Sequence, residues 1–136
     1  MDHNPGSADA IDLVGVKILL ADDEERLRLV VGMMLEELGA EVVAVDTCER
    51  AIDLYCEDDH RFDLVFLDLR MKGMGGDKAF RELIARAPGA RVVLASGVRP
   101  DDCLLDELAR SGCAFIEKPF DLDQIAKVIG EILHPN

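Results

Sequence analysis

Short apolar runs alternate five times along the chain with longer segments of helical periodicity. The runs predict strands at residues 17–21, 41–45, 64–67, 91–95 and 114–117. Their mostly apolar composition is typical of strands that helices cover on both faces. The longer segments carry apolar residues at intervals of three and four, which is the spacing of one buried helix face. The pattern therefore predicts five strand–helix units.

Local signals indicate where some of these helices begin. The second helix is expected to start near Asp46 or Thr47, because Asp46 and Glu49 have the spacing of a capping box. Pro100 fits the first position of the fourth helix, where the backbone N–H that proline lacks has no partner in the helix. These signals predict the starts of the second and fourth helices.

The alternation of strands and helices predicts an α/β fold with a parallel sheet and right-handed crossovers. Five units favour the flavodoxin-like, doubly wound (βα)5 arrangement, with strand order 2-1-3-4-5 and helices on both faces. The 136 residues suffice for one such domain. The first residues are polar and contain proline and glycine, so we expect a disordered leader over residues 1–14 and one domain over residues 15–136.

Composition excludes some classes of partner. The net charge of −13 argues against direct binding to nucleic acid or to an anionic membrane surface. No apolar stretch approaches the roughly 18 residues that a membrane helix needs. The four cysteines form no Cys-x-x-Cys pair, which favours reduced thiols in a cytoplasmic protein over a metal cluster or disulfides.

Polar side chains follow four of the predicted strands at the same end. Asp22 and Asp23 follow the first strand, Asp68 the third, Ser96 the fourth and Lys118 the fifth. In an open parallel sheet these ends meet at one crevice, where ligands bind. Clustered carboxylates repel one another unless positive charge is present, and a hard cation such as Mg²⁺ or Mn²⁺ takes oxygen ligands. One carboxylate could then attack a phosphorus atom and form an acyl phosphate.

Each of these residues also has an ordinary explanation. Asp22 and Asp68 could be turn formers or helix caps, Ser96 a turn hydroxyl and Lys118 a surface charge. Independent caps and turns have no reason to share one edge of a sheet. Their common position favours a joint functional site.

Four segments at these strand ends resemble the receiver domain of two-component response regulators, over about residues 16–134: KILLADDEE, DLVFLDLRM, VVLASG and FIEKPF. The resemblance implies that Asp68 accepts a phosphoryl group from a sensor histidine kinase or a histidine phosphotransfer protein. It also implies that the face formed by the fourth helix, the fifth strand and the fifth helix switches. Such a domain promotes its own phosphorylation and dephosphorylation and turns over no external substrate.

The same resemblance implies a metal site. Asp68 and Asp23 would bind Mg²⁺ directly, Asp22 would hold metal-bound water, and the backbone carbonyl of Arg70 would complete the protein ligands. The side chains of Arg70 and Val98, two residues after the acceptor and Ser96 respectively, would flank the path of attacking water and tune the lifetime of the phosphoryl group.

Four further roles come from the resemblance. Ser96 would turn toward the phosphoryl group, Lys118 would pair with it, and Phe115 would act as the aromatic switch residue. Pro119 would follow a cis peptide bond. Phe115 stands where the family often has tyrosine, so the inward ring would lack a hydroxyl.

One departure concerns Lys72, at a position where the family commonly has proline. A free N–H and a more mobile loop would follow. The strings SG-x-RPDD and MGGDKAF also resemble receivers attached to hybrid sensor kinases.

Three other functions are compatible with an aspartate or a phosphate site at the end of a strand. A pseudo-receiver that only docks other proteins would not need the intact aspartates, Ser96 and Lys118. A haloacid-dehalogenase-like phosphatase needs a second aspartate where this chain has Arg70. A flavodoxin-like electron carrier needs a loop rich in glycine and hydroxyl groups after the first strand, where this chain has DDEE. The identity of the kinase, the output and a possible homodimer stay open from sequence.

Overall fold

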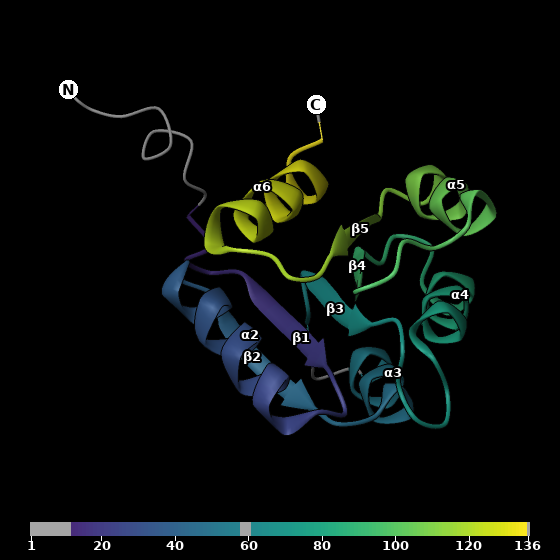
Figure 1. Cartoon of the computed structure of the whole chain (residues 1–136), viewed down its shortest axis with the longest axis horizontal. Helices are drawn as coiled ribbons and strands as arrows, with labels where there is room; N and C mark the ends of the chain where they lie inside the picture. The colour runs from purple at the N-terminus through teal and green to yellow at the C-terminus, as the bar shows by residue number, and fades with distance from the viewer. Residues whose placement is uncertain (1–11, 58–60, 136) are drawn as a thin grey trace.

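Five strands alternate with five helices in the computed structural model, which describes residues 12–57 and 61–135 (Figure 1). The strands are β1 (Lys17–Ala21), β2 (Glu41–Val45), β3 (Leu64–Asp68), β4 (Val92–Ser96) and β5 (Ala114–Glu117). The helices are α2 (Glu25–Glu37), α3 (Cys48–Cys56), α4 (Gly76–Arg86), α5 (Asp102–Arg110) and α6 (Leu122–Leu133).

The strands form one parallel sheet in the order β2-β1-β3-β4-β5, which confirms the predicted flavodoxin-like doubly wound fold. The register aligns the carboxyl ends of the strands. Ala21 pairs with Leu67, Asp68 with Ala95, and Ser96 with Glu117. Residues at these ends therefore emerge along one edge of the sheet.

Helices α2 and α6 cover one face of the sheet, and α3, α4 and α5 cover the other (Figure 1). Successive side chains of a strand point to opposite faces, so each central strand contributes to two separate cores. In β1, Ile18 and Leu20 belong to the core under α2 and α6, whereas Leu19 and Ala21 belong to the core under α3–α5. This double burial explains the nearly uniform apolar runs in the sequence.

The start of α3 agrees with the predicted position near Asp46 or Thr47, but its cap differs from the prediction. Thr47 is the N-cap, and its hydroxyl accepts a hydrogen bond from the backbone N–H of Arg50 at 3.0 Å. The capping box predicted from Asp46 and Glu49 is therefore wrong. The hydroxyl one residue later already satisfies a free N–H of the first turn, which is the task of an N-cap.

The start of α5 also needs correction. Asp101 is the N-cap, and its carboxylate accepts a hydrogen bond from the backbone N–H of Leu104 at 2.9 Å. Pro100 therefore lies one residue before the cap and not at the first helical position. Asp101 can cap the helix with its side chain, which Pro100 cannot do.

The expected boundary of the domain at residue 14 is too late. Residues 1–11 of the expected leader lie outside the described residues. Leu13, by contrast, is wholly buried, and its N–H donates a hydrogen bond to the carbonyl of Leu38 at 2.8 Å. The ordered domain therefore includes residues that the polar composition around them assigned to the leader. Among the described residues, no helix combines the length and the apolar character that crossing a bilayer requires.

Candidate functional site

Three carboxylates converge at the carboxyl edge of the sheet. Asp22 and Asp23 directly follow β1, and Asp68 is the last residue of the neighbouring strand β3. One oxygen from each side chain lies within 4.8 Å of the others. Asp22 and Asp68 are only 3% and 9% exposed, whereas Asp23 is more open to solvent. The structure thus brings together the acidic residues that the sequence placed at this edge.

Lys118 joins this cluster from the end of β5. Its Nζ lies 2.8 Å from Asp68 Oδ1, where it donates a hydrogen bond, and 3.8 Å from Asp22 Oδ2. Its backbone N–H donates to the carbonyl of Ser96 at 2.8 Å, which ties the lysine to the adjacent strand. The peptide bond between Lys118 and Pro119 is cis. The lysine therefore provides positive charge in direct contact with two of the three carboxylates.

Ser96 is the last residue of β4, one position beyond the residue that pairs with Asp68. It is only 2% exposed, and its Oγ accepts a hydrogen bond from the backbone N–H of Val98 at 3.1 Å. A hydroxyl that accepts in this way keeps its proton free to donate. Ser96 thus places a hydrogen-bond donor on the strand next to Asp68.

The charge balance of the cluster is negative. Burial raises the pKa of Asp68 above its ordinary value, and the negative charges of Asp22 and Asp23 raise it further. The hydrogen bond and the charge of Lys118 act in the opposite direction without cancelling the rise. A divalent cation would relieve this imbalance, and oxygen-only donors are what Mg²⁺ and Mn²⁺ prefer. The residues present therefore fit such an ion.

Backbone and side-chain contacts fix Asp22 in place. Its Oδ1 accepts a hydrogen bond from the backbone N–H of Glu24 at 2.9 Å. Its carbonyl accepts a hydrogen bond from Arg28 Nη1 at 2.8 Å, and its own N–H donates to the carbonyl of Val45 at 3.2 Å. Asp22 therefore combines the local turn contact that a lone aspartate would make with membership of the cluster.

The loop between β3 and α4 packs tightly against Asp68. A Cβ atom at Gly76 would lie 2.5 Å from the carbonyl oxygen of Asp68 and 2.9 Å from the Cα of Leu69. The N–H of Gly76 donates to the carbonyl of Leu69 at 3.0 Å, which brings the loop back over the end of β3. Sequence reasoning missed this supporting role, although the run GMGG was its signal.

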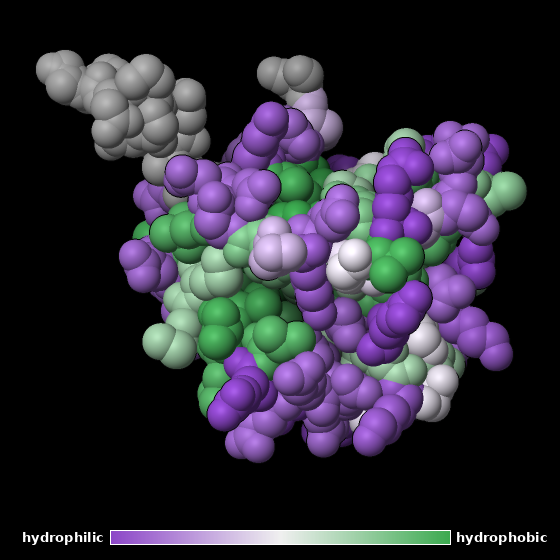
Figure 2. Space-filling view, viewed as in Figure 1, coloured by the Kyte–Doolittle hydropathy of each residue, from purple (hydrophilic) through white to green (hydrophobic). Residues whose placement is uncertain are grey.

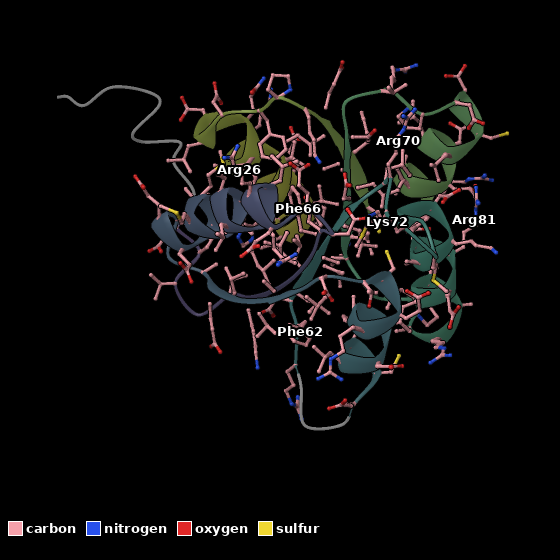
Figure 3. The ribbon with its side chains drawn as sticks, turned by 60° about the horizontal axis from the view of Figure 1, so that its bottom comes forward. Arg26, Phe62, Phe66, Arg70, Lys72 and Arg81 are labelled. Carbon is pink, nitrogen blue, oxygen red and sulfur yellow. The ribbon has the colours of Figure 1, made fainter. Side chains whose placement is uncertain are left out.

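The loop also carries Arg70 and Lys72, which are both exposed (Figure 3). The backbone N–H of Lys72 donates a hydrogen bond to Asp23 Oδ2 at 2.9 Å. Sequence reasoning foresaw a free N–H at this position but not its acceptor. Val98 is 54% exposed, and Phe115 is half-buried against the core under α3–α5.

Comparison with known proteins matches residues 18–130 to the family of response regulator receiver domains. The chain is 30% identical over 119 residues to the chemotaxis protein CheY of Bacillus subtilis, which covers 87% of this chain and 98% of that protein. It is 36% identical over 109 residues to the sensory/regulatory protein RpfC of Xanthomonas campestris, covering 76% of this chain but only 15% of RpfC. The response regulator TrrA of Thermotoga maritima, solved in complex with Mg²⁺-BeF, superposes with a TM-score of 0.73 at 24% identity, covering 87% of this chain and 99% of that one.

Proposed function

Because the chain belongs to the family of response regulator receiver domains, we propose that Asp68 accepts a phosphoryl group from a phosphohistidine of a sensor histidine kinase or a histidine phosphotransfer protein. The observation that carries this proposal is the contact of 2.8 Å between Lys118 Nζ and Asp68 Oδ1 inside a cluster of three carboxylates. The four cysteines are free thiols, which suits a signalling domain that works in the reducing cytoplasm.

The transfer forms one bond and breaks another. A carboxylate oxygen of Asp68 attacks the phosphorus, the P–N bond breaks, and the imidazole leaves with the electron pair and takes up a proton. Mg²⁺ or Mn²⁺, held by Asp68, Asp23, the carbonyl of Arg70 and, through water, Asp22, would neutralise charge on the phosphoryl oxygens. The acyl phosphate then loses its phosphoryl group to water as inorganic phosphate, so the domain acts only on itself.

The neighbouring residues respond to the new charge. Lys118 exchanges its contact with Asp68 Oδ1 for one with a phosphoryl oxygen, and Ser96 rotates to donate its hydroxyl proton. Phe115 then moves deeper into the space beside β4, and the face of α5, β5 and α6 repacks. A partner that prefers the repacked face reads the phosphorylated state as a shift in populations.

Arg70 and Val98 are proposed to tune the lifetime of the acyl phosphate. Both are exposed and lie two residues beyond Asp68 and Ser96 respectively. Side chains at these positions can flank the path of attacking water. Their size therefore affects hydrolysis more than folding.

The histidine partner is proposed to dock on an apolar patch of α2, defined by Leu29, Val30 and Met33, which are 59%, 52% and 66% exposed. Figure 2 shows apolar side chains gathered over this helix. Beside the patch lies a hollow of about 410 Å³, which is lined by Leu27, Val30, Val31, Met34, Lys118, Pro119 and Phe120. The hollow thus connects the patch to the lysine that contacts Asp68. A helical partner lying here would present its histidine to the acceptor.

Met33→Glu is expected to slow transfer from a phosphorylated histidine phosphotransfer protein by about 10-fold or more, because a charge in an apolar interface is costly. Phosphorylation by acetyl phosphate, which needs no docking, should keep its wild-type rate. Val14→Glu alters an apolar residue that is 74% exposed outside the patch, and it serves as the matched control. Equal slowing with both donors, or no slowing with the protein donor, would remove α2 as the docking surface.

The test of the proposed function is the intact mass of the protein after incubation with acetyl phosphate. We expect the gain of one phosphoryl group in the presence of Mg²⁺, little gain when Mg²⁺ is chelated, and none in Asp68→Asn. Asp106→Asn, which alters an exposed aspartate on α5, should retain the gain. A wild-type protein that takes up no phosphoryl group from this donor or from a phosphorylated histidine protein would instead support the pseudo-receiver.

A further inference from the structure

The three carboxylates of the cluster differ in what holds them. Lys118 contacts Asp68 and Asp22, and the N–H of Glu24 donates to Asp22 as well. Asp23 has no cationic side chain within 4.0 Å among residues 12–57 and 61–135, and its hydrogen-bond donor there is the backbone N–H of Lys72 at 2.9 Å. The most exposed acid of the cluster is thus held by a single amide.

We propose that Lys72 is a positioning residue for the cation, and that it acts through its backbone N–H rather than through its ammonium group. The N–H holds the Asp23 carboxylate inside the cluster and thereby increases the affinity for Mg²⁺. This inference rests on the proposed function, because it assigns a role in the same metal site. A proline at position 72 has no N–H and cannot play this role.

The geometry leaves Asp23 able to bind a metal ion. An ionised carboxylate offers about four lone-pair sites, and the N–H of Lys72 occupies one site, on Oδ2. Oδ1 and the second lone pair of Oδ2 stay free for the ion. The negative charges of Asp22 and Asp68 repel the carboxylate of Asp23 and favour a movement of this side chain outward into solvent. The hydrogen bond from Lys72 opposes that movement before any cation arrives, so less ordering is needed on binding.

The ammonium group of Lys72 has a different effect from the N–H. The side chain is exposed, and its Nζ forms no ion pair within 4.0 Å among the described residues. The positive charge of the ammonium group repels Mg²⁺ and lowers the affinity for the ion. The N–H raises that affinity, because it orders the carboxylate of Asp23. The two effects therefore have opposite signs, and two substitutions separate them. Lys72→Ala removes the charge and keeps the N–H, and Lys72→Pro removes both.

The experiment measures Mg²⁺ binding by isothermal titration calorimetry, with no phosphodonor present, for the wild type, Lys72→Ala and Lys72→Pro. Lys72→Ala is expected to bind Mg²⁺ as tightly as the wild type or slightly more tightly. Lys72→Pro is expected to bind about 10-fold more weakly than Lys72→Ala, the usual scale for loss of a group that orients a metal ligand. Equal dissociation constants for these two variants would overturn the inference.

Amide hydrogen exchange provides a readout that does not depend on folding of the proline variant. The N–H of Lys72 should be protected in the metal-free wild type and should lose that protection in Asp23→Ala. Rapid exchange in the wild type would overturn the inference even if Lys72→Pro did not fold.

Failure of the proposed function is distinguishable from failure of this inference. A wild-type protein without Mg²⁺ binding would refute both. Tight Mg²⁺ binding by the wild type and by both variants would refute the role of Lys72 alone.

Discussion

Lys118→Gln is expected to slow phosphorylation of Asp68 by acetyl phosphate by about 10²- to 10³-fold at saturating Mg²⁺, the scale of losing one preorganised donor to a developing negative charge. Lys118 Nζ is 2.8 Å from the attacking carboxylate, and the backbone N–H of Lys118 is hydrogen-bonded to the carbonyl of Ser96 on the neighbouring strand β4. Glutamine retains a donor but neither the charge nor the reach. The rate of appearance of the phosphorylated mass measures the effect.

The same substitution should change the pH dependence of phosphorylation. Transfer needs the ionised carboxylate of Asp68, so the rate falls as the pH drops through its pKa. Burial and the charges of Asp22 and Asp23 raise this pKa, and Lys118 lowers it. Removing the lysine therefore raises the pKa further and moves the acid limb of the rate profile to higher pH.

The effect of Lys118→Gln on the free energy of unfolding should also depend on pH. An acid whose pKa in the folded state lies above its unfolded value contributes stability below the unfolded pKa, and that contribution is lost as the pH rises through the folded pKa. The destabilisation caused by Lys118→Gln in the metal-free protein is therefore expected to be largest at neutral pH and to shrink in acid. Lys127→Gln, an exposed lysine on α6, is the control. Equal pH profiles for the two variants would contradict the assigned contact.

Gly76→Ala is expected to destabilise the domain by about 1–3 kcal/mol, the usual cost of overpacking. The added Cβ would lie 2.5 Å from the carbonyl oxygen of Asp68 and 2.9 Å from the Cα of Leu69, and backbone atoms cannot move aside as a flexible side chain can. Helix propensity alone predicts the opposite result, because Gly76 is the first residue of α4 and alanine is favoured over glycine in helices by about 1 kcal/mol.

Urea unfolding of the metal-free protein measures the sign of this effect. Gly89→Ala is the matched control, because a Cβ at Gly89 meets no atom within 4 Å. The control should be neutral or slightly more stable than the wild type. A stabilised Gly76→Ala variant would show that the loop is not held against the end of β3.

The strands were predictable because each is a short apolar run between polar segments. The bounds of β1, β2 and β5 agree with their predicted ranges, whereas β3 extends to Asp68 and β4 both begins and ends one residue later than predicted, at Val92 and Ser96. The apolar runs end before these polar residues, but backbone pairing continues past them. The N–H of Leu69 donates to the carbonyl of Ala95, and the N–H of Lys118 donates to the carbonyl of Ser96, both at 2.8 Å.

The cluster of Asp22, Asp23, Asp68 and Lys118 was predictable from topology, because parallel strands deliver the residues at their carboxyl ends to one edge. The backbone groups that hydrogen-bond to the carboxylates of the cluster were not predictable from the sequence. From sequence, the N–H that reaches Asp23 could belong to any residue of the loop, and the folded loop places that of Lys72 there. The burial of Leu13 was hidden for a different reason, since Asp12 and Gly15 interrupt the apolar residues around it and the segment is too short to show a strand or helix period.

The two separate cores have a consequence for how the domain exchanges a phosphoryl group with its partners. The hollow beside the α2 patch is backed by Val31 of the core under α2 and α6, whereas Phe115 packs against the opposite core. The sheet lies between Val31 and Phe115, although α6 shares a face of the sheet with α2. The patch of Leu29, Val30 and Met33 belongs to α2 alone, which is not among the elements proposed to repack. We therefore expect the patch itself to change less on phosphorylation than the face of α5, β5 and α6. A docking surface that is retained after transfer permits the phosphoryl group to return from Asp68 to a histidine as well as to leave a histidine for Asp68. The net direction of transfer would then depend on the relative amounts of the partners.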